Sequence, residues 1–277
     1  VADVRALDSA TVEIETARPS PVLLNKLAFI AIVPRDTPLS PVTHPVGTGP
    51  VRCVSGRAGG EIVGERFERY WGPRPSWERV RFLSFPEARA RGEAVAAGEA
   101  DAVSRFPYDM AEWASRKEGM RLVATPGLGV TFLGFEVRPP SPFADLRVRK
   151  AVAAAIDRVD LVPREERKYS MPIEQLVPAG VFGSIPSLPV TRPDPREARR
   201  LLAEARFHPG APIRLTFADT HADVGRGLVR QLRAVGIPLD PEPLPQAELY
   251  ARFVADPPVL FLMSWAAGTG DGSDVLE

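Results

Sequence analysis

Three histidines and one cysteine are the residues of this chain best suited to metal binding or nucleophilic catalysis. His44, His208 and His221 stand far apart, and none belongs to the H-x-x-H or H-E-x-x-H spacing that lets one helix supply two metal ligands. Cys53 has no second cysteine to pair with and no catalytic motif around it. We therefore expect no metal site, no cofactor, no internal disulfide and no catalytic residues.

A glycine-rich segment, Gly268-Thr269-Gly270-Asp271-Gly272, shares only its composition with phosphate-binding loops. It lacks the lysine and the following helix that such loops use to hold phosphates, and the chain contains no G-x-S-x-G motif and no P-loop. The segment is therefore predicted to be a turn, with a role in ligand binding as the alternative.

The stretch from Pro142 to Arg158 predicts an amphipathic helix around which the chain is organised. Asp145 can accept a hydrogen bond from a free amide of the first turn, and its charge suits the helix dipole. One predicted buried stripe follows at helical spacing: Val148, Val152, Ala155, Ile156 and Val159. The pattern predicts a helix over 146–159 that packs on a core.

Strands and helices alternate along the rest of the chain. Alternating or continuous apolar runs predict strands at 11–16, 30–33, 51–54, 61–67, 80–83, 100–103, 122–123, 130–135, 213–217, 237–239 and 259–263. Helices are expected at 21–27, 84–98, after Pro107, and at 194–205, 224–235 and 246–254.

Local signals refine these elements. Ser84 and Glu87 predict a capping box, and Asp194 an N-cap. The runs at 51–54 and 61–67 predict an antiparallel hairpin with its turn at 57–60, and 36–50 and 163–193 predict irregular connections. Repeated strand-helix order favours the α/β class.

The composition predicts a globular protein. The chain has 277 residues, of which 44% are hydrophobic and 25% charged, enough to bury a substantial core. Basic and acidic residues each number 35, so the formal net charge of zero implies no general attraction to nucleic acid. No apolar run approaches the roughly 20 residues that a membrane-spanning helix needs.

The ends of the sequence indicate that it is part of a longer protein. It starts at Val1 without a methionine or a signal peptide, and a predicted strand follows almost at once. We therefore expect further segments on both sides. The closing Leu276 and Glu277 could be native or added.

Four motifs in this order resemble the extracellular solute-binding proteins of family 5, the oligopeptide-, dipeptide- and nickel-binding receptors of ABC importers. They are Gly47-Thr48-Gly49-Pro50, the FERYWG of Phe67 to Gly72, Gly98-Glu99-Ala100-Asp101, and the PFADLRVRKAVAAAIDR of Pro142 to Arg158. The resemblance extends from about Thr11 to Trp265. Val51 departs from it, since an aromatic residue commonly follows the first motif.

The resemblance implies a two-lobed α/β fold of the periplasmic binding protein type (type II), incomplete at both ends. Residues 1–50 would end an inserted segment and cross between lobes, 51–145 would form part of lobe I, and 146–277 part of lobe III. The implied function is to capture a small solute, peptide-like or other, between the lobes without chemistry and to pass it to ABC permease subunits. The implied location is periplasmic or extracellular, with a membrane anchor in a preceding segment as one option.

Two alternatives stay open at this point. One is an enzyme, such as a hydrolase with an unrecognised site, and the other is a sensor or scaffold domain that keeps the fold without transport.

The resemblance also implies where a ligand would be contacted. The corresponding positions are Ser104, Arg105 and Phe106, then Phe132, then Ser264, Trp265 and Ala266. Arg105 could pair with a carboxylate, and Trp265 could stack on the ligand. Phe132 and Trp265 could equally be core aromatics. The motif before Pro142 departs from the family pattern, because Glu136 stands where asparagine is usual.

Peptide-binding members carry an aspartate after the tryptophan that pairs with the free amino terminus of the peptide. Alignment on Trp265 places Gly268 at that position. A buried ammonium group without a partner carries a large desolvation penalty. The sequence therefore predicts that a peptide with a free amino terminus is not bound in that mode, unless Asp271 moves into the role.

Overall fold

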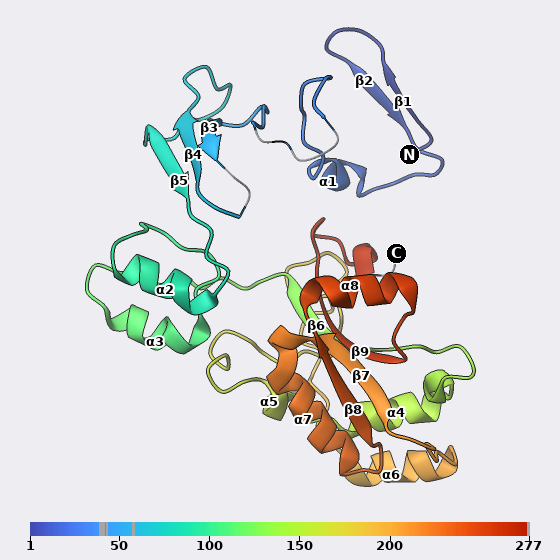
Figure 1. Ribbon diagram of the computed structural model, residues 1–277. Coiled ribbons are helices and arrows are strands. Elements are labelled where there is room, and N and C mark those ends of the chain that lie inside the picture. The colour runs from blue at the N-terminus through green and yellow to red at the C-terminus, as the bar shows by residue number, and fades with distance from the viewer. Residues whose placement is uncertain (39–41, 43, 57–58, 276–277) are drawn as a thin grey trace. The chain divides into compact units, whose positions relative to one another are not determined.

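A computed structural model describes residues 1–38, 42, 44–56 and 59–275. The chain forms two compact units, Val1–Leu122 and Val123–Glu277 (Figure 1). Leu276, Glu277 and part of the predicted 57–60 turn lie outside the described residues.

The first unit opens with a short antiparallel hairpin and a five-residue helix. Strand β1 (Asp3–Ala6) pairs with β2 (Val12–Glu15), and helix α1 (Leu23–Leu27) follows. The strand predicted at 30–33 is wrong, since these residues adopt no strand structure. Ile30 and Ile32 are exposed and pair with no neighbouring strand, so their apolar character alone does not make them a strand.

A three-stranded antiparallel sheet forms the next part of the first unit. Strands β3 (Val51–Gly56), β4 (Ile62–Arg66) and β5 (Arg79–Phe82) pair in sequence order. The predicted hairpin is confirmed, with a register shift between Cys53 and Ser55.

Helices α2 (Ala88–Ala96) and α3 (Tyr108–Arg116) complete the first unit. The predicted capping box is wrong, because the helix begins after Glu87, whose side chain caps no amide. The strands predicted at 100–103 and 122–123 are also absent. The Arg91 guanidinium instead donates to the carbonyl oxygens of Phe85, Pro86 and Arg105. A side chain of α2 therefore holds the loop that follows the helix, where hydrogen bonds between strands were expected.

The second unit is built on a four-stranded mixed sheet in the order β6–β9–β7–β8. Its strands are β6 (Gly129–Phe135), β7 (Ile213–Ala218), β8 (Leu239–Leu244) and β9 (Leu260–Ala266). Strands β9, β7 and β8 are parallel, whereas β6 is antiparallel to β9. Helices α7 (Ala222–Arg233) and α8 (Gln246–Ala255) connect the parallel strands.

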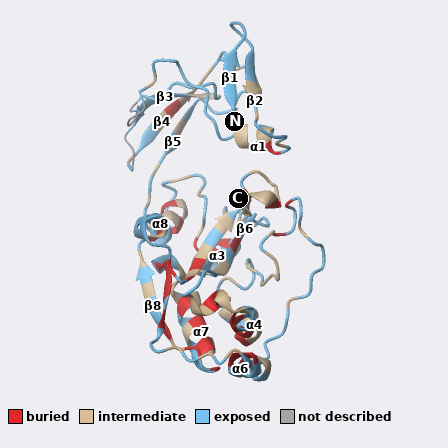
Figure 2. Ribbon diagram, turned by 90° about the vertical axis from the view of Figure 1, so that its right-hand side faces the viewer, coloured by how far each residue is buried: buried red, intermediate tan, exposed pale blue. Residues whose placement is uncertain are grey.

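The main hydrophobic core lies between one face of this sheet and helices α4 (Leu146–Ala155), α6 (Pro195–Glu204) and α7. Leu215, Phe217, Leu260 and Leu262 reach it from the sheet, because alternate residues of a strand share a face. Figure 2 shows buried residues along α4, α6 and α7. The apolar stripes predicted for these helices are confirmed, except at one end of α4.

Helix α4 ends earlier than predicted. Asp145 caps it as expected, accepting from the Arg147 amide at 2.8 Å. Ile156 and Asp157 are extended, and Asp157 caps a second helix, α5 (Arg158–Leu161), by accepting from two amides. The expected 146–159 helix is therefore two helices, and Val159 is exposed rather than buried.

The remaining elements follow the sequence closely. Asp194 caps α6 by accepting from the amides of Arg196 and Glu197. The short strand expected at 237–239 begins later, at β8. Three single turns, η1 (Pro142–Ala144), η2 (Asp219–His221) and η3 (Gly272–Val275), complete the described elements. The lobe boundaries expected at 50/51 and 145/146 stay a prediction. Strand β6 precedes the second of these boundaries, but it pairs with β9, which follows that boundary.

Candidate functional site

Three polar side chains meet at the carboxyl edge of the second sheet. Strands β7 and β9 are parallel and end at this edge, and antiparallel β6 begins there. Ser264 Oγ lies 2.8 Å from Thr131 Oγ1 on the neighbouring strand and 2.9 Å from His221 Nε2 in η2, which follows β7. Thr131, His221 and Ser264, the edge cluster, thus form a continuous hydrogen-bonded group.

His221 is half-buried, and burial lowers the pKa of its imidazole below the ordinary value. The neutral form is therefore favoured near pH 7, with one ring nitrogen as donor and the other as acceptor. Nδ1 lies 3.4 Å from the Thr220 hydroxyl. The edge cluster is an uncharged group of donors and acceptors.

A serine beside a histidine is also the start of a nucleophile–base pair. In hydrolases a third group, usually a carboxylate, orients the imidazole from its other nitrogen. Within the described residues that contact is made by the Thr220 hydroxyl. The arrangement therefore suits hydrogen bonding to a ligand better than proton transfer.

The sequence does not predict the edge cluster. His221 is one of three scattered histidines, and Thr131 belongs to none of the motifs. Ser264 and Thr131 are 133 residues apart, so no local spacing could connect them. The available signal was that β6, β7 and β9 were each predicted, because the carboxyl ends of parallel strands gather functional residues.

The predicted ligand residues of β6 and β9 divide between the two faces of the sheet. Register pairs Thr131 with Ser264 and Val130 with Trp265. Ser264 and Ala266 therefore share the face of the edge cluster, whereas Trp265 lies on the opposite face together with Phe132. Consecutive strand residues cannot all line one side.

The face that carries Phe132 contains an aromatic group. The Phe132 and Phe261 rings are 6.4 Å apart in an edge-to-face arrangement. Phe253 of α8 contacts Phe261 in the same way at 4.7 Å. These contacts favour the core-aromatic alternative for Phe132.

Asp271 lies in a loop whose carboxylates are already hydrogen-bonded. Its Oδ1 accepts from the Ser273 amide at 2.8 Å, and this bond holds the pKa of the Asp271 carboxyl below its ordinary value. Asp274 accepts from both the amide and the hydroxyl of Thr269. The Gly268 amide donates to the Ala266 carbonyl at 2.8 Å. The predicted turn is therefore a closely hydrogen-bonded loop.

Ser104, Arg105 and Phe106 lie together in the first unit, in the loop between α2 and α3. Arg105 is exposed and adopts a left-handed conformation with φ of 54°. Its carbonyl accepts from Arg91, which fixes the loop from the α2 side. The other five predicted residues all belong to the second unit.

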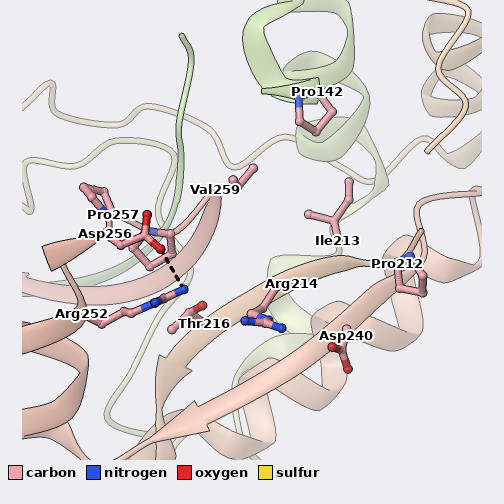
Figure 3. A pocket seen from close by; sticks show the side chains of 11 residues that line it. Pro142, Pro212, Ile213, Arg214, Thr216, Asp240, Arg252, Asp256, Pro257 and Val259 are labelled. Carbon is pink, nitrogen blue, oxygen red and sulfur yellow. Dashed lines mark ion pairs between the residues drawn. The ribbon is translucent and has the colours of Figure 1, made fainter. Parts of the chain in front are cut away.

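A cavity of about 400 Å³ lies at the opposite, amino edge of the second sheet (Figure 3). Arg252 pairs with Asp256 at 3.2 Å, and Arg214 with Glu242 at 3.4 Å, so both guanidinium groups have acidic partners. The remaining lining is largely proline and aliphatic. None of the predicted ligand residues lines this cavity.

Among the described residues, no group of three or more His, Cys, Asp or Glu side chains is placed to hold a metal ion. None of the helices formed by those residues has the length and apolar character to cross a membrane.

Comparison with known proteins gives a family and a set of relatives. The family model described as bacterial extracellular solute-binding proteins, family 5 Middle, matches residues 1–277. Glutathione-binding protein GsiB of Pectobacterium atrosepticum is 27% identical over 291 residues, covering 98% of this chain and 55% of that protein. GsiB of Escherichia coli O1:K1 is 26% identical, covering 100% and 57%. The chain thus spans little more than half the length of these relatives.

Solved structures show the same fold. DppA from Helicobacter pylori in complex with peptide STSA matches with a TM-score of 0.83 and 19% identity, covering 99% of this chain and 56% of that one. NikA from Brucella suis in complex with Fe(III)-EDTA matches with a TM-score of 0.70 and 25% identity, covering 80% and 49%. These matches confirm the expected α/β class and the periplasmic binding protein-like (type II) fold.

Proposed function

This chain belongs to the bacterial extracellular solute-binding proteins of family 5, and we propose that the protein containing it captures a small solute for an ABC importer. Binding of this kind requires contacts and no turnover, so it needs no nucleophile or base. The names of similar proteins support a binding role: GsiB is a glutathione-binding protein, and the DppA structure holds a peptide. ABC permease subunits as partners and a periplasmic or extracellular location belong to the same proposal.

The edge cluster is the observation that carries this proposal. Ligands of α/β sheets bind outside the carboxyl ends of the strands, and Thr131, His221 and Ser264 meet at that edge. Their mutual hydrogen bonds fix the orientation of each group before a ligand arrives, which reduces the entropy lost on binding. Ser264 and Ala266 are proposed to contact the ligand from this face.

Ser104, Arg105 and Phe106 are proposed to contact the ligand, with Arg105 available for a carboxylate. Trp265 lies near the end of β9 on the face opposite the edge cluster, and stacking of its ring on the ligand is proposed as a separate contact. Arg105 offers a planar pair of donors, which favours a ligand with at least one carboxylate.

The loop after Trp265 supports exclusion of peptides bound through a free amino terminus. Gly268 supplies no carboxylate at the aligned position. Asp271 already accepts from Ser273 and Asp274 from Thr269, so recruiting either to an ammonium group would break or share an existing bond. An ammonium group buried there would lack a dedicated partner.

A thermal-shift screen of the protein expressed from its complete gene tests the function. The probes are glutathione, a pool of di- to pentapeptides, the same pool with acetylated amino termini, and Ni(L-His)2. A bound solute at 100 times its Kd should stabilise the protein by about 2.7 kcal/mol. Hydrolysis of any probe, followed by mass spectrometry, would favour the alternative of an enzyme, and a screen without any shift would contradict the proposal.

Matched variants test the site. Ser264→Ala and Trp265→Ala should each weaken binding of a probe that shifts the wild type, while Ser115→Ala, an exposed serine of α3, should not. Affinity that is unchanged by Trp265→Ala would refute its ligand role. Tight binding of free peptides that acetylation abolishes and Asp271→Ala leaves intact would refute the exclusion of the amino terminus.

A further inference from the structure

One large aromatic side chain is held in an exposed position beside the loop that follows β9. The side chain of Phe182 is 78% exposed. Its main chain pairs with the β9 loop, since the Phe182 amide donates to the Gly270 carbonyl at 3.0 Å and its carbonyl accepts from the Gly272 amide at 2.9 Å. Phe182 therefore has a fixed backbone next to the loop that carries Asp271.

Several features keep this position rigid. Gly180 and Gly183 adopt φ values of 90° and 92°, a conformation that side chains rarely permit, so the turn on either side of Phe182 depends on glycine. Val181, the preceding residue, is buried and anchors the turn. A Cβ on Gly272 would lie 2.8 Å from Val177 Cγ2, so the two segments approach closely.

The location distinguishes Phe182 from apolar residues that are merely scattered on a surface. Strand β9 ends at Ala266, on the edge where Ser264 and His221 meet. The segment from 267 to 272 connects that edge directly to the main-chain pairing with Phe182. An aromatic side chain has only two rotatable bonds, so it loses little entropy when a ligand covers it.

We propose that Phe182 is a ligand-contact residue and that the solute carries an alkyl or aryl group that packs on its ring. This inference rests on the proposed solute-binding function and adds the chemical class of one part of the ligand. The edge cluster contacts polar atoms of the solute, and Phe182 covers its apolar part.

A matched pair of probes tests the inference in the protein expressed from its complete gene. Glutathione and S-hexylglutathione carry the same charges and differ by one alkyl chain. The wild type should bind S-hexylglutathione about tenfold more tightly by calorimetry, because the chain removes apolar surface from water against the ring. Phe182→Ala should abolish this preference, and Phe182→Leu should keep part of it.

Ile185→Ala is the control, since Ile185 is an exposed apolar residue of the same segment. It should leave the preference unchanged, and the Tm of the unliganded Phe182→Ala variant should match the wild type. The inference would be overturned if the wild type bound both probes with equal affinity or bound neither. The proposed function is tested separately, by the wider screen of solutes. A lower Tm of the unliganded Phe182→Ala variant would also overturn it, since the ring would then pack against the protein itself.

Discussion

Gly225 and Gly227 lie two residues apart in helix α7 and face different neighbours. Gly225 and Gly227 are both buried and both helical. A Cβ on Gly225 would lie 2.6 Å from Phe217 Cζ and 2.9 Å from two further ring atoms. A Cβ on Gly227 would lie 2.5 Å from one atom, Leu161 Cδ2. The ring belongs to the core of the sheet, whereas the Leu161 methyl is the end of a flexible side chain in a four-residue helix.

The expected stability changes follow from these contacts. Replacing a helical glycine by alanine stabilises the helix by up to about 1 kcal/mol in both variants. Overpacking a core costs about 1–3 kcal/mol, and only Gly225→Ala should incur it, because Phe217 is 2% exposed and belongs to the hydrophobic core. Gly225→Ala should therefore be about 1–3 kcal/mol less stable than Gly227→Ala.

Urea unfolding of the wild type and both variants measures this difference. The slope of unfolding free energy against urea concentration should be the same for all three proteins. Because the helix propensity gain is common to both variants, it cancels from the comparison. For a chain of this size, each 1 kcal/mol should also appear as about 2–4 °C in Tm. A Gly225→Ala protein as stable as Gly227→Ala would refute the conclusion that α7 packs on the Phe217 ring at this residue.

Two further predictions concern helix caps. Asp194→Ala removes the acceptor for the amides of Arg196 and Glu197 and should destabilise the protein by about 1 kcal/mol in urea unfolding, with Asp194→Asn recovering most of the loss. The hydrogen bonds from Arg147 lower the pKa of Asp145 from 3.8 to about 2. Because the folded pKa lies below the unfolded value, this stabilisation is complete above pH 3.8 and lost as the pH falls through about 2. The stability gap between wild type and Asp145→Asn should narrow over that range, and a gap independent of pH would contradict the assignment.

Much of the fold was predictable because its signals are local. The caps at Asp145 and Asp194 and the stripes of α6 and α7 involve residues within a few positions of each other, and all were confirmed. The family and its type II fold were also identified from short motifs. The predictions failed where a segment with a suitable local pattern has no neighbouring segment to pair with. Ile30 to Val33 had a strand's composition but no neighbouring strand.

The candidate site also shows the difference between local signals, which the sequence carries, and contacts that depend on the tertiary structure. The sequence by itself predicted a buried strand at 259–263, which ends before Ser264, Trp265 and Ala266. Only the tertiary structure decided that β9 continues to Ala266, so that Ser264 and Trp265 face opposite sides, and that His221, 43 residues away along the chain, joins Ser264. The reason is that strand register and crossover connections bring distant residues together, and a hydrogen bond between distant side chains leaves no periodicity in the sequence.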